Sequence, residues 1–119
     1  MKGQLSNKVR VHHILDALAE VEGYITNVTE EEFLRNSEKR FATIKQIEII
    51  GEACNKITDD VKQAHAQISW SQIIGFRNIS IHEYHSVSFH IVWNIATTDL
   101  PALKEQMLAL LEYVDNTSK

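Results

Sequence analysis

The spacing of apolar residues constrains the fold of this chain more than any other feature. Between residues 5 and 27 they recur three to four positions apart, with one step of five, and a similar stripe runs from residue 100 to residue 114. This period matches one face of an α-helix, whereas a half-buried strand needs strict alternation. Alternation is not sustained in any segment. The pattern therefore predicts an all-α protein.

Hydrogen-bonding residues predict where the first helices begin. Thr29 is followed three positions later by Glu32, which is the capping-box signature, so a short helical segment is expected from residue 30. Ser37 offers a second cap, for a long helix that reaches residue 57. Gly51 lies in the middle of that helix, where glycine is unfavourable, and this indicates close approach by another helix.

In the second half of the chain, the apolar spacing and the candidate caps predict shorter helices followed by a long one. The candidate caps are Thr58, Ser69 and either Ser86 or Ser88. Thr98 and Asp99 are expected to end one helix and start the last, in whose first turn Pro101 loses little by lacking an N–H. With short connections and no repeat, residues 1–119 are expected to form a single domain. The expected architecture is an up-and-down bundle of four main helices plus short connecting helices.

Composition and charge narrow the functional classes. The net charge of -4 argues against broad, non-specific nucleic-acid binding, which depends on a basic surface. No apolar run approaches the roughly 20 residues that span a bilayer, and the N-terminus lacks a signal-peptide core, so a cytoplasmic protein without a membrane partner is expected. The single cysteine, Cys54, lies in an apolar helical pattern and is expected to be a small buried thiol.

Polar groups are concentrated in residues 74–85. This segment contains Arg77, Asn78, His82, Tyr84 and His85. If the helix that starts near residue 70 continued through it, Arg77 and Tyr84 would lie nearly in line, because seven residues make about two turns, and the amide and the two imidazoles would form a neighbouring row. A permanently charged guanidinium beside groups that titrate near neutral pH suits an anionic ligand, particularly phosphate.

Other interpretations of these residues stay open from spacing alone. Arg77 could pair with Glu83 or with a carboxylate of the first helix, as part of the structure only. A metal site is less favoured, because no carboxylate or cysteine cluster completes a familiar set of ligands around the histidines. A second basic cluster consists of Arg35, Lys39 and Arg40. It is either a solvated helix face or a phosphate-contacting patch, and Arg40 and His85 are therefore candidate substrate contacts.

The ordered motif resembles the HEPN superfamily, and most closely its HepT-like branch. That branch carries Arg, four residues, His, one residue and Tyr, which Arg77, His82 and Tyr84 match. The flanking residues that also match are Trp70, Ile74, Gly75, Asn78, the run Gly51-Glu52-Ala53, Trp93 and the run Asp99-Leu100-Pro101. Phe76 and Ser80 depart from the usual residues without removing a polar group of the motif.

The resemblance implies a helical homodimer in which two copies of the motif meet at the interface. Many members are metal-independent endoribonucleases without a cofactor, acting as toxins beside a small nucleotidyltransferase antitoxin. Carried to this chain, Arg77 would stabilise the phosphoryl transition state and His82 would be the general base or acid for attack by the ribose 2′-OH. Asn78 would orient the phosphate or His82, and Tyr84 would be the tyrosine that the antitoxin adenylylates.

A second hypothesis belongs to a different class. The chain could be a non-catalytic helical partner, or a substrate-binding subunit, of a minimal nucleotidyltransferase. Both hypotheses place Tyr84 beside a nucleotidyltransferase, but only the first requires Arg77 and His82 to act on RNA. Loss of RNA cleavage on substitution of these two residues separates the hypotheses.

Overall fold

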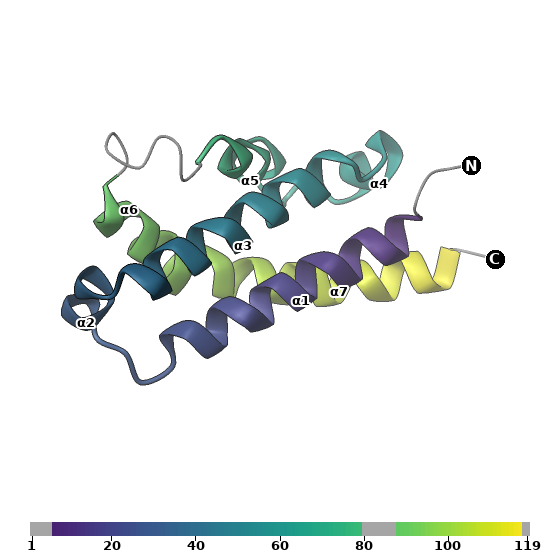
Figure 1. Ribbon diagram of the computed structural model, residues 1–119. Helices are drawn as coiled ribbons and strands as arrows, with labels where there is room; N and C mark the ends of the chain where they lie inside the picture. Colours follow the sequence, from purple (N-terminus) through teal and green to yellow (C-terminus); the bar gives the residue numbers. More distant parts are fainter. Residues whose placement is uncertain (1–5, 80–87, 118–119) are drawn as a thin grey trace.

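Three long helices form the body of the protein. The computed structural model describes residues 6–79 and 88–117. In this part of the chain α1 (Asn7–Ile25), α3 (Ser37–Asn55) and α7 (Leu100–Thr117) run side by side along the long axis, with α1 packed against both of the others (Figure 1). Every regular element in these ranges is helical. The predicted all-α bundle is confirmed.

Helix α1 supplies one wall of the core. Ser6 caps it, since its hydroxyl accepts a hydrogen bond from the Val9 N–H at 3.2 Å. The apolar side chains at helical spacing turn inward, where removal of their surface from water stabilises the bundle. Those that are fully buried on α1 are Val11, Ile14, Ala17, Leu18 and Val21.

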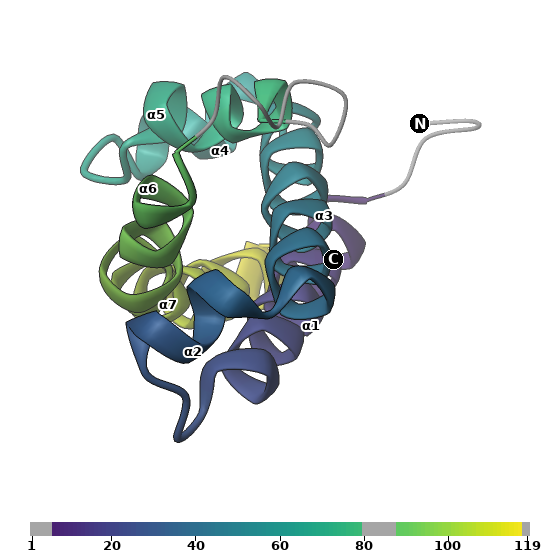
Figure 2. The same cartoon turned by 60° about the vertical axis from the view of Figure 1, so that its left-hand side comes forward.

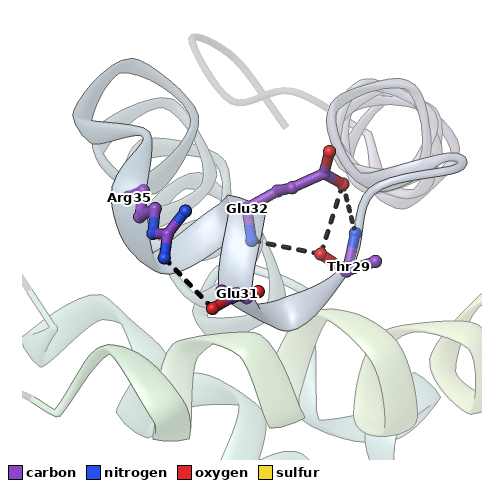
Figure 3. A network of polar contacts seen from close by, with 4 residues as sticks. All are labelled: Thr29, Glu31, Glu32 and Arg35. Carbon is purple, nitrogen blue, oxygen red and sulfur yellow. Dashed lines mark hydrogen bonds and ion pairs between the residues drawn. The ribbon is translucent and has the colours of Figure 1, made fainter.

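The link between α1 and α3 contains the predicted capping box. Helix α2 (Glu30–Arg35) begins where the Thr29 hydroxyl accepts from the Glu32 N–H at 3.1 Å, and the Glu32 carboxylate accepts from the Thr29 N–H at 2.9 Å (Figure 3). The next cap differs from the prediction. Asn36, not Ser37, caps α3, because its side chain accepts from the Lys39 N–H at 3.0 Å. Asparagine caps as well as serine, and the local pattern could not rank the two neighbours.

Short helices cover one side of α3. Helix α4 (Asp59–Ala64) lies near the end of the bundle where α1 begins (Figure 1). Thr58 precedes it without making a side-chain cap. Instead the Thr58 hydroxyl accepts from Asn7 Nδ2 at 2.9 Å, which ties α4 to α1. Ser69 likewise makes no side-chain cap at the start of α5 (Trp70–Gly75).

The helix that carries Arg77 is shorter than a continuous helix to residue 84 would be. Helix α5 tightens into the 3-10 helix η1 (Phe76–Asn78), and Ile79 is extended, with φ -84° and ψ 105°. The condition for aligning Arg77 with Tyr84, a helix that continues from residue 70 through the motif, is therefore not met at Ile79, and residue 84 itself lies outside the described residues. Residue 79 closes a tight 3-10 turn through its N–H to the carbonyl of Phe76, a way of ending a helix that the apolar period does not encode.

The last two predicted helices form one continuous helical run. Helix α6 (Phe89–Asn94) passes through the π-helical segment η3 (Ile95–Asp99) into α7, and the axis changes direction between them (Figure 2). The predicted break at Thr98 and Asp99 is therefore wrong. A π turn absorbs the local irregularity next to Pro101, which lacks the N–H for an ordinary helical bond, so the chain bends without stopping.

Aromatic contacts hold α6 on the bundle. Phe33 of α2 packs against Trp93 with their ring centroids 5.2 Å apart, and Phe41 of α3 meets Phe89 at 6.2 Å. Cys54 is fully buried as expected, and burial raises the pKa of its thiol to about 12. None of the described helices is long and apolar enough to cross a membrane.

Candidate functional site

Arg77 is held against α3 by a backbone contact at Gly51. A methyl group on Gly51 would lie 2.6 Å from the backbone nitrogen of Arg77 and 2.9 Å from the carbonyl oxygen of Ile73. Both distances are shorter than a side-chain carbon tolerates, so only glycine leaves room for this approach. The predicted close approach at Gly51 is confirmed. The helix that meets it is the one that presents Arg77.

The guanidinium of Arg77 pairs with a carboxylate of α3. Arg77 Nη1 lies 3.5 Å from Glu52 Oε1, and their side chains are 41% and 57% exposed. An exposed pair of this kind contributes little to stability, about 0–1 kcal/mol. The ion pair therefore orients the guanidinium but leaves it accessible to an anion from solvent.

This ion pair lies in a pocket of about 450 Å³ between α3 and η1. The residues that line it are Lys45, Glu48, Ile49, Glu52, Arg77 and Asn78. The four residues from α3 are spaced by three, one and three, which places them on one face of that helix. Sequence reasoning missed Lys45 and Glu48, and it did not pair Glu52 with Arg77.

The sequence-predicted site residues fall into three groups. Arg77 and Asn78 come together in the pocket, both exposed, as consecutive residues at the end of η1. His82, Tyr84 and His85 lie outside the described residues. Arg40 belongs to different surroundings, and its part in substrate binding stays a prediction.

Arg40 is half-buried and bridges three helices. Its guanidinium stacks over the Phe89 ring at 4.6 Å from the centroid and donates a hydrogen bond to the Leu34 carbonyl. These contacts hold α2 and α6 against α3. They also give the guanidinium partners within the protein itself. Arg35, from the same predicted cluster, pairs with Glu31 at 3.1 Å on the exposed face of α2 (Figure 3).

Metal ligands do not gather in the part of the chain that the structure describes. No group of three or more histidine, cysteine, aspartate or glutamate side chains there is close enough to hold an ion. The two glutamates that line the pocket have cationic partners, since Glu52 faces Arg77 and Glu48 lies 3.7 Å from Lys45. The pocket thus offers two cations, each balanced by a carboxylate, and suits an anion that replaces the carboxylates.

Comparison with known proteins shows the family of the chain. The family model described as "Ribonuclease HepT-like" matches residues 14–110, from the middle of α1 into α7. The chain belongs to the Ribonuclease HepT-like family. The match includes Gly51, the whole pocket and the Arg77 motif.

Several curated proteins are similar to this chain over most of its length. "Probable ribonuclease HepT" of Thermococcus cleftensis is 33% identical over 83% of this chain and 90% of its own length. "Putative RNase MJ1380" of Methanocaldococcus jannaschii is 31% identical over 84% of this chain and 92% of its own.

A third relative is a longer protein. "Gamma-glutamylcyclotransferase and putative RNase MJ0434" of Methanocaldococcus jannaschii is 32% identical over 91% of this chain, and the chain spans about half of that protein, 49%. No solved structure matches the chain.

Proposed function

We propose that this protein is a metal-independent endoribonuclease acting in the cytoplasm, and the toxin of a pair with a nucleotidyltransferase antitoxin. Membership of a ribonuclease family supports the proposal, as do similar proteins named as RNases. The observation that carries it is the fixed position of Arg77. Its backbone rests on Gly51 while its guanidinium, paired only with an exposed carboxylate in the described region, opens into a pocket.

The proposed reaction needs two functions from the protein. The ribose 2′-oxygen attacks the adjacent phosphorus, its proton passes to a base, and the bond to the 5′-oxygen breaks as that oxygen gains a proton. Arg77 would stabilise the extra negative charge on the phosphoryl oxygens. His82 would move the protons, since imidazole titrates near neutral pH. Asn78, beside Arg77 in the pocket, would orient the phosphate or His82.

A requirement for the 2′-OH also reconciles the proposal with an acidic chain. With a net charge of -4 the surface as a whole does not attract nucleic acid. Selection of RNA would depend on the reacting hydroxyl and on a small site containing Arg77. In the proposed homodimer two such sites would lie near each other and raise the local positive charge.

Control of the activity would act through Tyr84. An AMP group transferred to its phenol adds bulk and negative charge close to the motif, which would repel the substrate phosphate and occlude Arg77. Co-expression with the proposed nucleotidyltransferase antitoxin and intact-mass measurement test this step. We expect one added AMP on the parent protein and none on Tyr84→Phe, while Tyr24→Phe on α1 keeps the modification. A parent protein of unchanged mass contradicts it.

The ribonuclease activity is tested by the cleavage products. In the presence of EDTA the purified protein is expected to cut RNA and leave 2′,3′-cyclic phosphate ends, and a 2′-O-methyl substrate should stay intact. Arg77→Ala should lose the activity. Arg35→Ala is the matched control, since Arg35 is also exposed and paired with a glutamate but lies on α2. Cleavage that survives Arg77→Ala contradicts the mechanism, whereas a wild-type protein that does not cleave RNA favours the non-catalytic partner.

A further inference from the structure

The pocket beside Arg77 has a second cation that the proposed chemistry does not use. Lys45 lies on the same face of α3 as Glu52, seven residues earlier. Its side chain is 60% exposed, and its contact with Glu48 is loose, with 3.7 Å between Lys45 Nζ and Glu48 Oε1. The ammonium group is therefore available to a ligand at little energetic cost.

The geometry of α3 gives an approximate separation between the two cations. Seven residues of α-helix rise about 10 Å, and Arg77 is in contact with the residue at the far end of this interval. The long, flexible lysine side chain can shorten the gap. Two cations at this separation on one surface can bind neighbouring phosphates of a single extended strand.

One apolar side chain, Ile49, lines the pocket among the charged groups. Ile49, one turn after Lys45, is 36% exposed and lines the pocket. Large aliphatic side chains are usually buried, although single exposed ones are common. Along α3 this isoleucine lies between Lys45 and Glu52, the partner of Arg77, where a ribose or a base would cover it.

We propose that this pocket holds one nucleotide of the RNA, with its reacting phosphate at Arg77, a neighbouring phosphate at Lys45 and its nucleoside over Ile49. The inference rests on the proposed ribonuclease function and names the substrate contacts of the same site. Glu48 and Glu52 give it selectivity. Each phosphate must displace a carboxylate from its cation, so a strand that engages both cations is bound and an isolated anion is bound weakly.

The salt dependence of binding tests Lys45 directly. A labelled 2′-O-methyl oligoribonucleotide binds without being cleaved, because it lacks the attacking hydroxyl. Each phosphate contact to a single strand contributes about 0.7 to the slope of log K against log salt concentration. Lys45→Gln is therefore expected to weaken binding and to reduce the magnitude of that slope by about 0.7. Lys56→Gln is the control, since Lys56 is an exposed lysine at the end of the same helix and does not line the pocket.

The outcomes separate the two proposals. A wild-type slope for Lys45→Gln, or an equal reduction for Lys56→Gln, overturns the nucleotide pocket. If the nucleotide pocket is overturned in this way but the wild-type protein cleaves unmodified RNA, the ribonuclease function stands without the pocket. A wild-type protein that neither cleaves nor binds RNA overturns both. Thermal unfolding of Lys45→Gln should match wild type, which shows that the exposed substitution leaves the fold intact.

Discussion

The backbone nitrogen of Arg77 lies so close to Gly51 that a single methyl group there would reach within 2.6 Å of it. This contact joins a position in the middle of α3 to the residue that the family motif begins with. The carbonyl oxygens of Ile73 and Ile74 approach the same point, at 2.9 and 3.2 Å from that methyl position. The placement of Arg77 thus depends on a residue that has no side chain.

Gly51→Ala is expected to push η1 away from α3. The atoms that it meets are backbone atoms, which cannot rotate aside, so we expect the free energy of unfolding to fall by about 1–3 kcal/mol. RNA cleavage should fall at temperatures where the variant is fully folded, because Arg77 moves. Chemical denaturation and cleavage rates measure the two effects.

Gly23→Ala provides the matched control for this substitution. Gly23 is exposed within α1 and nothing lies within 4 Å of its methyl position, so alanine should be neutral or stabilise the protein by up to about 1 kcal/mol. The Gly51 account is wrong if both alanine variants behave alike.

Glu52→Gln tests the competition between carboxylate and phosphate for Arg77. Loss of this exposed pair should change the free energy of unfolding by less than about 1 kcal/mol. The 2′-O-methyl oligoribonucleotide should bind more tightly, by up to about fivefold, since phosphate no longer displaces a charged group. Glu31→Gln breaks the comparable pair with Arg35 and should leave the affinity unchanged. Weaker binding by Glu52→Gln contradicts the competition.

Local rules predicted those features that depend on neighbouring residues. The capping box at Thr29 needs a hydroxyl and a carboxylate three positions apart, and both the spacing and the residue types are visible in the sequence. Gly51 could be interpreted because glycine costs a helix interior about 1 kcal/mol, which indicates a steric reason for its presence. Its contact partner could not be named, because packing between distant segments is not encoded in local spacing.

The errors have a common physical origin. The end of η1 at Asn78 and the continuous run through η3 depend on how the backbone closes its last hydrogen bonds, which apolar periodicity does not report. Nothing in the local sequence distinguishes Lys45 and Glu48 from other exposed charged residues, because their position beside η1 follows from tertiary packing. The side of α3 that becomes a pocket is set by tertiary contact, so the partners of Arg77 appeared only in the structure.

Thr29→Ala should destabilise the protein by about 1 kcal/mol, because the Glu32 N–H loses its acceptor. Asn36→Ala should cost a similar amount, whereas Ser37→Ala should cost little, since Asn36 is the residue that caps α3. Denaturant midpoints for the three variants measure the difference. A larger loss for Ser37→Ala than for Asn36→Ala contradicts the cap assignment.

The same box predicts an effect at acid pH. The hydrogen bond from the Thr29 N–H lowers the pKa of the Glu32 carboxyl below its ordinary value of 4.5. Its contribution to stability is therefore present above that value and is lost as the pH falls through the lower folded value. An NMR titration of Glu32 should show the depressed pKa in the wild-type protein and a partial rise toward 4.5 in Thr29→Ala, which loses the second hydrogen bond, from the Thr29 hydroxyl, and keeps the one from the backbone N–H. The same value in both proteins contradicts the assignment.

Cys54 should be inert in the folded protein. Burial raises the pKa of its thiol from 9.0 to about 12, so almost no thiolate is present at pH 8. A thiol reagent should label it slowly in buffer and rapidly in denaturant. The stability that comes from the neutral buried thiol is complete below about pH 9 and declines as the pH rises toward 12. Rapid labelling of the folded protein contradicts this burial.

The value of kcat/KM for RNA cleavage by Arg77→Ala and His82→Ala, each compared with wild type, tests the central claim most directly. Loss of a charge-stabilising group or of a general acid–base group typically costs about 100-fold or more. We therefore expect a loss of at least about 100-fold for each variant, with thermal unfolding close to wild type. Values of kcat/KM within a few fold of wild type for both folded variants would contradict the account.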